Sequence, residues 1–175
     1  MSKIALFFGP EGGNVHKVTK ELAGIIGNNK VDIIPVINSK SNDVDKYDKI
    51  IFLASAIGLD QWDMQDVKDD WDKFFPELDK LSFDKKTVAI VGLGDHIKYP
   101  SHFVTSIAAL GEKLSEKGAD IKGAVATDGY TYQDTEALNK DGLFYGLPID
   151  EDNEEELTTE RLTNWVNLIK SDFDI

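Results

Sequence analysis

The sequence predicts an α/β fold in which a parallel sheet lies between helices that cover both of its faces. Apolar segments too short for helices alternate with segments whose apolar residues recur at three- and four-residue steps. Such strict alternation of strand and helix is typical of folds built around a parallel sheet. Most of the short segments are apolar throughout, as strands buried on both faces are. With 175 residues and no repeat or linker, we expect a single domain over residues 1–175.

The first strand, turn and helix form the stretch around which the rest of the chain is organised. The run from Ile4 to Phe8 is apolar, and the glycine-rich segment 9–14 interrupts it. This geometry directs backbone N–H groups and the positive end of a helix dipole at one point, which suits an anion such as a phosphate. The residues that follow form one apolar helix face: Val15, Val18, Leu22, Ile25 and Ile26.

Two further strands follow, separated by a polar segment. Residues 31–37 are predicted as the second strand, and Pro35 places its end near an edge or rim of the sheet. Residues 38–45 are polar and are predicted as a loop. Residues 49–54 predict a third, fully buried strand, which opens into a long loop over residues 55–65.

The middle of the chain continues the alternation. The long loop leads into a helix, then residues 87–91 predict the fourth strand and residues 92–100 its outgoing loop. The next helix ends at Lys117 and Gly118, a basic residue and a glycine where helix C-termini favour them. Residues 121–126 predict a fifth strand. The inner faces of the two helices are expected to carry Val67, Trp71, Phe74, Phe75 and Leu78, and Phe103, Ile107, Leu110 and Leu114.

The C-terminal part holds an irregular section and a last helix. Residues 127–139 are irregular, residues 142–149 predict a second short strand, and the acidic run 150–156 is predicted as a solvated turn. Thr158 or Thr159 is expected to cap the last helix, near whose start acidic residues favour the helix dipole. Its inward residues are expected to be Leu162, Trp165, Val166 and Ile169.

Composition restricts the classes of partner. The 32 acidic and 19 basic residues give a formal net charge of −13, which argues against nucleic acid because its binding needs a basic face. The same charge makes an anionic membrane surface an unfavourable partner. Two interpretations of the acidity remain, namely solubility and steering toward basic protein partners.

The cellular compartment is predicted from three features that the sequence lacks: cysteine, an apolar membrane span and a signal peptide. Without cysteine, the chain has no disulfides, thiolate metal sites or cysteine nucleophiles. No apolar run approaches the roughly 18 residues of a membrane span. Because residues 1–3 run directly into the first strand, we expect no signal peptide and a cytoplasmic protein.

The fold predicts where a ligand would bind. In open parallel sheets, ligands bind beyond the carboxyl ends of the strands, at the topological switch point. If the first strand is central, the loops over residues 9–14, 55–65 and 92–100 converge there. They carry the anion-binding turn, a tryptophan and a tyrosine. This combination fits a flat aromatic group with a phosphate tail.

Over essentially its whole length the sequence resembles the long-chain flavodoxins. The similarity is closest in the first strand and turn, in the fourth-strand loop with its Gly92-Leu93-Gly94-Asp95 and Tyr99-Pro100, and in the C-terminal third. That third contains Thr127-Asp128-Gly129-Tyr130, then Asp141 to Leu147, and then Asp150-Glu151-Asp152-Asn153. The extra segment that interrupts the last strand separates long-chain from short-chain members.

The resemblance implies a three-layer sandwich with a five-stranded sheet of order 2-1-3-4-5. It also implies FMN as cofactor and transfer of single electrons between a basic reductase and acceptor enzymes, with no substrate of its own. We expect a monomer that docks through its acidic surface and has no catalytic or metal-binding residues. By position, the residues that would bind FMN are Gly9, Pro10, Glu11, Gly12, Gly13, Asn14, Val15, Ser55, Ala56, Ile57, Trp62, Leu93, Gly94, Asp95, His96 and Tyr99.

The phosphate turn departs from the family pattern. Pro10, Gly12 and Val15 stand where the family usually carries a Ser or Thr hydroxyl, and Pro10 also lacks an N–H. Each net hydrogen bond contributes roughly 0.5–1.5 kcal/mol, and more to a charged group, so three losses weaken binding. The amides of Gly12, Gly13, Asn14 and Val15 remain. We therefore expect weakened rather than abolished FMN binding.

Several side chains have two interpretations. Trp62, later in its loop than the family's Trp, either covers one flavin face or is a half-buried loop residue, whereas Trp71 and Trp165 are predicted core residues. His96, where the family usually has Gln, either lies at the flavin edge with redox-coupled protonation or is a partly solvated loop histidine. Lys17 either adds charge to the turn or is solvated.

Three other functions compete with electron transfer by FMN. A flavodoxin-fold protein that has lost FMN would act as a protein-interaction module. A phosphoacceptor receiver needs an acidic pair after the first strand and an Asp after the third, where this chain has Phe8-Gly9-Pro10 and Ser55-Ala56. A flavin-dependent NAD(P)H reductase needs a nicotinamide site, which no motif marks.

Overall fold

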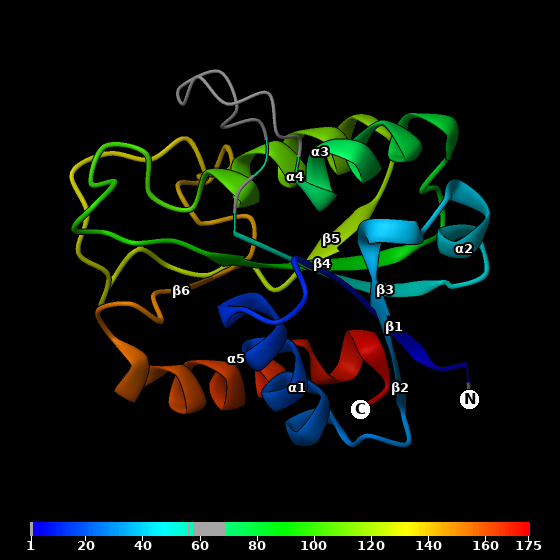
Figure 1. The fold of residues 1–175 in the computed structure, drawn as a ribbon, viewed down its shortest axis with the longest axis horizontal. Coiled ribbons are helices and arrows are strands. Elements are labelled where there is room, and N and C mark those ends of the chain that lie inside the picture. Colours follow the sequence, from blue (N-terminus) through cyan, green and yellow to red (C-terminus); the bar gives the residue numbers. More distant parts are fainter. Residues whose placement is uncertain (1, 56, 58–68) are drawn as a thin grey trace.

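A parallel sheet forms the centre of the computed structural model, which describes residues 2–55, 57 and 69–175 (Figure 1). Its strands have the order β2-β1-β3-β4-β5, and β6 pairs with β4. Every strand pairing in the described residues is parallel. The predicted class and strand order are confirmed, and β6 is a small addition. The strands are β1 (Ile4–Gly9), β2 (Val31–Pro35), β3 (Lys49–Ala54), β4 (Thr87–Leu93), β5 (Asp120–Lys122) and β6 (Leu147–Ile149).

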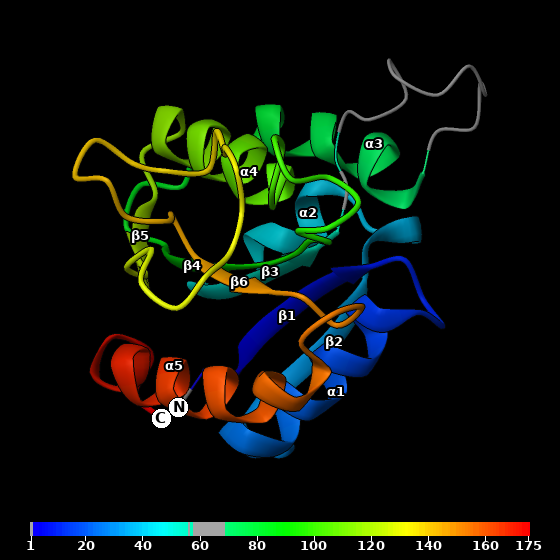
Figure 2. The ribbon, with the colours of Figure 1, turned by 90° about the vertical axis from the view of Figure 1, so that its left-hand side faces the viewer.

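Helices cover both faces of this sheet (Figure 2). Helices α1 (Asn14–Ile26) and α5 (Thr158–Phe173) lie on one face, and α3 (Asp70–Phe74) and α4 (Thr105–Glu116) lie on the other. The short helix α2 (Ser41–Asp45) precedes β3. None of the helices in the described part of the chain is long and apolar enough to cross a bilayer. The 3₁₀ turns in the described residues are Val36–Asn38, Phe75–Lys80 and Glu155–Leu157.

The alternation of strand side chains creates two apolar cores. Phe7 and Phe52 point to the side of α3 and α4, where they pack in one cluster with Trp71. Leu6 and Leu53 point to the other side, where α1 and α5 supply the apolar residues. Trp71 and Trp165 are 1% and 2% exposed, so both are core residues as predicted.

The fifth strand is shorter than predicted, and β6 takes over its place beside β4. β5 pairs with residues 87–89 of β4, whereas β6 pairs with residues 91–93. The chain leaves the sheet at Gly123, whose φ of +78° lies in the left-handed region. Of the predicted strand 142–149, only the last three residues belong to the sheet. Phe144 instead forms antiparallel bridges with Val125 and Leu138.

Three other elements differ from the prediction. The second strand ends at Pro35, an edge position as expected, and a 3₁₀ turn follows it. The predicted loop 38–45 contains α2, because the Asp43 carboxylate accepts a hydrogen bond from the Lys40 amide at the helix start. Neither threonine caps α5: the hydroxyls of Thr158 and Thr159 donate to Glu151 and Glu21.

Two helical glycines, one in α4 and one in α1, provide a matched test of how tightly α4 packs against the residues that cover it. A Cβ at Gly111 of α4 would lie 2.4 Å from Cγ of Tyr145, whereas a Cβ at Gly24 of α1 would meet no atom within 4 Å. We expect Gly111→Ala to destabilise the protein by about 1–3 kcal/mol, because the added methyl displaces a packed ring. Gly24→Ala should stabilise it by roughly 0.5–1 kcal/mol through helix propensity. Urea unfolding measures both, and changes of the same sign would contradict the packing argument.

Candidate functional site

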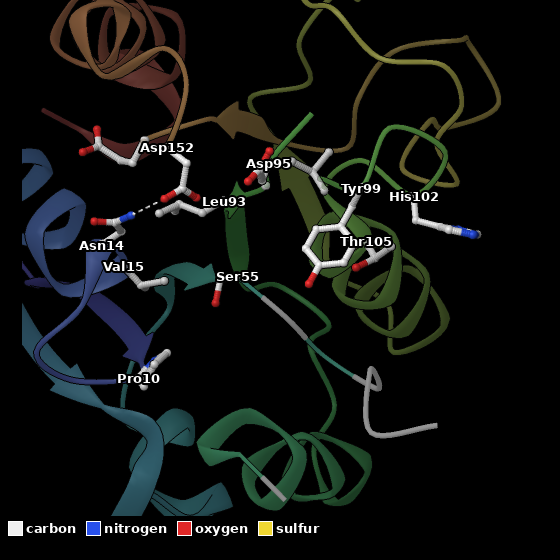
Figure 3. Close-up of a pocket in the computed structure, with 13 residues that line it drawn as sticks. Pro10, Asn14, Val15, Ser55, Leu93, Asp95, Tyr99, His102, Thr105 and Asp152 are labelled. Atoms are coloured by element: carbon white, nitrogen blue, oxygen red, sulfur yellow. Dashed lines mark hydrogen bonds between the residues drawn. The ribbon is translucent and has the colours of Figure 1, made fainter. Parts of the chain in front are cut away.

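A cavity of about 350 Å³ opens where β1, β3 and β4 end (Figure 3). The loops that follow these three strands meet there, as the sequence predicts. Eight of the residues expected at the site line the cavity: Pro10, Asn14, Val15, Ser55, Leu93, Gly94, Asp95 and Tyr99. The other lining residues in the described chain are His102, Val104, Thr105, Glu151 and Asp152.

The turn after β1 forms one end of this cavity. Gly9 is the buried last residue of β1, and the exposed residues Glu11, Gly12 and Gly13 lie outside the cavity lining. Gly12 has a φ of +85°, a conformation that favours glycine. A Cβ at Gly12 or at Gly13 would meet no atom within 4 Å, so the surface of the turn is open.

The N-terminus of α1 follows this turn without a side-chain cap. Gly13 is its N-cap residue, and the first helical turn holds no acidic residue. The amides of a first turn have no acceptor within the helix, so they and the helix dipole favour an anion. The Gly12 amide is already used, because it donates to Nδ1 of His16 at 3.0 Å. The amides of Asn14 and Val15 belong to the first turn beside the cavity.

Acidic side chains border this end of the cavity, although the sequence predicts a solvated turn there. Glu151 is only 8% exposed, and its carboxylate accepts a hydrogen bond from Lys17 at 2.8 Å. Lys17 also pairs with Glu155, and hydrogen bonds to these two carboxylates, Glu151 first, raise the pKa of Lys17. Lys17 is therefore both ion-paired and solvent-exposed, with 49% of its side chain accessible. Asp152 accepts a hydrogen bond from Asn14 at 3.4 Å (Figure 3).

The loop after β3 contributes one side of the cavity. Ser55 lines it, whereas Ile57 is 8% exposed and belongs to the apolar core. Ile57 therefore supports the sheet rather than the cavity surface. Ala56 and Trp62, which are also predicted to bind FMN, lie outside the described residues.

The loop after β4 forms the other wall. The Tyr99 ring is 48% exposed and faces the cavity (Figure 3). The Asp95 carboxylate accepts hydrogen bonds from the amides of Ile97 and Lys98 at 3.0 and 2.8 Å. The bond from the Lys98 amide is the largest cause that lowers the pKa of Asp95, and Asn153 adds to it. Asp95 is therefore a fixed negative charge at the cavity.

His96 does not line the cavity, because its ring is bonded to a buried carboxylate. Its amide and its Nδ1 contact the same Asp150 oxygen, at 3.0 and 2.5 Å. The Gly94 amide donates to the carbonyl of Ile149. The amides of Gly94 and His96, two of the residues predicted to bind FMN, thus already have acceptors in the protein. The Asp95 amide lies between them.

Comparison with known proteins identifies the family. The family model described as flavodoxin matches residues 6–165. The chain belongs to the flavodoxin family. A flavodoxin from a Nostoc species is 36% identical over 173 residues, which cover 99% of this chain and 98% of that protein. Flavodoxin 1 of Escherichia coli is 31% identical over 175 residues, which cover 100% of this chain and 97% of that protein.

Solved structures agree with this assignment. A mutant of the Fusobacterium nucleatum flavodoxin, described as bound to flavin mononucleotide, is 25% identical and has a TM-score of 0.86. It covers 99% of this chain and 98% of its own. The resemblance stated from the sequence is therefore confirmed. Flavodoxins are electron carriers that act between redox partners and convert no substrate of their own.

Five lining residues of this flavodoxin were missed by sequence reasoning. His102, Val104 and Thr105 precede or begin α4, where the apolar helix pattern indicates packing rather than a ligand. Val104 has a φ of +50°, an unusual conformation for a β-branched residue, which no sequence pattern reveals. Glu151 and Asp152 were assigned to a solvated acidic run, and their distance from the turn after β1 in sequence hides their contact with Asn14 and Lys17.

The fold also brings together three potential cation ligands whose sequence spacing indicates no metal site. His96, Asp150 and Glu154 each place one ligand atom within 4.8 Å of the others. However, Asp150 accepts hydrogen bonds from His96 and Asn153, and Glu154 pairs with Arg161 at 2.8 Å. The three side chains thus form a hydrogen-bonded cluster whose carboxylates already have partners.

Proposed function

We propose that this flavodoxin binds FMN in the cavity after β1, β3 and β4 and carries single electrons between redox proteins. The observation that carries the proposal is the arrangement of the cavity. An uncapped helix N-terminus borders one end, and the exposed Tyr99 ring forms the opposite wall. A phosphate fits the first end, and a flat aromatic ring fits the second.

The residues of the phosphate end fit a phosphate in part. The open turn and the first-turn amides of Asn14 and Val15 offer backbone donors, and no acidic residue of α1 repels an anion there. Glu151 and Asp152 face the same end, but Lys17 neutralises the first and Asn14 bonds the second. With no hydroxyl from residues 10, 12 or 15, this supports phosphate binding by backbone amides alone.

The opposite wall orients the ring. Tyr99 would stack on one face of the isoalloxazine, and the loop over residues 93–96 would lie at its edge. When bound, FMN supplies the one-electron chemistry, which no side chain of the protein provides. The carboxylate of Asp95 and the cavity's acidic border disfavour additional negative charge, which lowers the potential at which an electron is accepted.

The remaining properties follow from the surface and the family. The net charge of −13 and the acidic residues around the cavity favour docking with a basic reductase or acceptor enzyme. We propose that the chain acts as a cytoplasmic monomer and forms one domain. The flavin site would comprise the sixteen residues predicted from the sequence, with Ile57 and His96 acting from behind the cavity surface.

A titration of the apoprotein with FMN and with riboflavin tests the proposal. We expect FMN to bind at least tenfold more tightly than riboflavin, because only FMN contacts the amides at the start of α1, and several charge-assisted bonds together exceed 1.4 kcal/mol. Quenching of flavin fluorescence measures both affinities. Equal, weak binding would show that the turn is no phosphate site. Absence of any binding would favour the protein-interaction module.

A further inference from the structure

The carboxylate of Asp150 holds the His96 ring in one orientation. Asp150 is fully buried, and the His96 side chain is 15% exposed. Burial acts to raise the pKa of Asp150, but hydrogen bonds from His96 and Asn153 outweigh it and hold that pKa below its usual range. An ionised carboxylate can only accept, so Nδ1 of His96 carries a hydrogen. Nε2 is therefore the atom at which the ring gains or loses a proton.

Carboxylates from several elements lie close to the ring. Asp150 lies against it, and Glu154, just before the last helix, is part of the same cluster within 4.8 Å. Asp95, the neighbour of His96, is joined to Asp150 through Asn153, which donates to both carboxylates. Among the described residues, Arg161 pairs with Glu154, and the ammonium group of Lys98 lies over the Tyr99 ring.

The pair adjoins the proposed flavin site. Residues 93–95 and Tyr99 of the same loop line the cavity, and His96 lies between them in the chain. Charges that are partly buried interact strongly because water screens them little. An electron added in the cavity is one more negative charge beside a histidine, the side chain that most readily titrates between pH 5 and 8.

We propose that His96 is a proton site coupled to the redox state of the cofactor. The electron comes from the donor protein, and one proton from solvent binds Nε2 of the neutral imidazole, giving an imidazolium held by Asp150. When the electron leaves to the acceptor, the proton returns to solvent. This inference rests on the proposed FMN binding. By linkage, the proton raises the affinity for the electron by the same factor by which the electron raises the affinity for the proton.

The potential of the bound flavin as a function of pH tests this coupling. His96→Asn is the informative variant, because its Nδ2 takes the place of Nδ1 and can donate to Asp150 without titrating. Proton transfer on the flavin itself is common to both proteins and cancels in their difference. We expect the wild-type potential to exceed that of His96→Asn at low pH and to approach it at high pH. A coupling of about tenfold corresponds to a difference of 59 mV at low pH.

A second histidine–carboxylate pair supplies a comparison. His102 lines the cavity and lies 2.7 Å from Glu136, but the two side chains are 52% and 53% exposed, so solvent screens their charges more than those of His96 and Asp150. The pH-dependent part of the difference in potential should therefore be smaller for His102→Asn than for His96→Asn. A pH-independent difference for His96→Asn would show that His96 only holds the loop, and would overturn the inference while leaving FMN binding intact.

Nuclear magnetic resonance of the wild-type protein gives a test that needs no variant. The ring protons of His96 report its titration in the oxidised and in the reduced protein. We expect the midpoint to lie about one pH unit higher after reduction, the same tenfold coupling. Coincident midpoints would contradict the coupling. Failure to bind FMN at all would instead remove the proposed function on which the inference rests.

Discussion

Replacing Tyr99 by alanine is expected to weaken binding of FMN about 30-fold, the equivalent of about 2 kcal/mol. The ring lines the cavity and is 48% exposed, so it offers an uncovered aromatic face to a flat ligand. Stacking contributes about 0.5–1.5 kcal/mol, and removal of apolar ring area from water adds to it. Because the ring contacts the isoalloxazine rather than the phosphate, riboflavin should lose affinity by the same factor. Fluorescence quenching of both flavins measures this.

The phenylalanine variant separates stacking from hydrogen bonding. No described residue bonds to the hydroxyl of Tyr99, so Tyr99→Phe should change either affinity less than threefold. The stability of the apoprotein should change by less than about 0.5 kcal/mol in both variants, because the side chain is half exposed. Unchanged FMN affinity in Tyr99→Ala would place the flavin ring elsewhere.

The fold was predictable to the extent that strands are buried on both faces. Such strands are continuous apolar runs, and β1, β3 and β4 were found with nearly correct bounds. The edges of the sheet were less predictable because pairing rather than composition determines them. β5 ends at Lys122 because the backbone of Gly123 turns out of the sheet, and Val125, which follows, pairs with Phe144 instead.

The site was predictable where one segment of chain determines it. The three loops that line the cavity follow strands whose order the fold class implies, so Val15, Asp95 and Tyr99 were found from the sequence. Contacts between segments that are distant in the sequence were not predictable. The acidic run 150–156 has the polar composition of a solvated turn. Composition alone therefore does not reveal that Asp150 is fully buried. Only the fold brings Asn153 to Asp95, and Glu151 to Lys17.

Asp150→Ala is expected to lower the free energy of unfolding by about 3–5 kcal/mol at neutral pH. The carboxylate accepts hydrogen bonds from the amide and Nδ1 of His96 and from the amide and side chain of Asn153, at 2.5–3.1 Å. The variant takes this acceptor from all of these donors, of which the Asn153 side chain keeps Asp95, and creates a small cavity. Asp152→Asn is the control. Asp152 is exposed and accepts a hydrogen bond of 3.4 Å from Asn14, so the variant should change the free energy of unfolding by less than about 0.5 kcal/mol.

The loss of unfolding free energy on replacing Asp150 should also depend on pH, and the pKa of Asp150 determines in which direction. Hydrogen bonds lower this pKa despite burial, which acts to raise it, so the ionised carboxylate stabilises the folded state. A lowered carboxyl pKa contributes stability that is complete above the unfolded value near pH 4 and is lost as the pH falls through the folded value. Urea unfolding of the wild type and of Asp150→Asn, which keeps the shape of the side chain, should therefore differ most at pH 6–7. That difference should shrink as the pH falls below about 4. A difference that stays constant down to pH 3 would show that the shape of Asp150, rather than its charge, holds the loop beside the cavity.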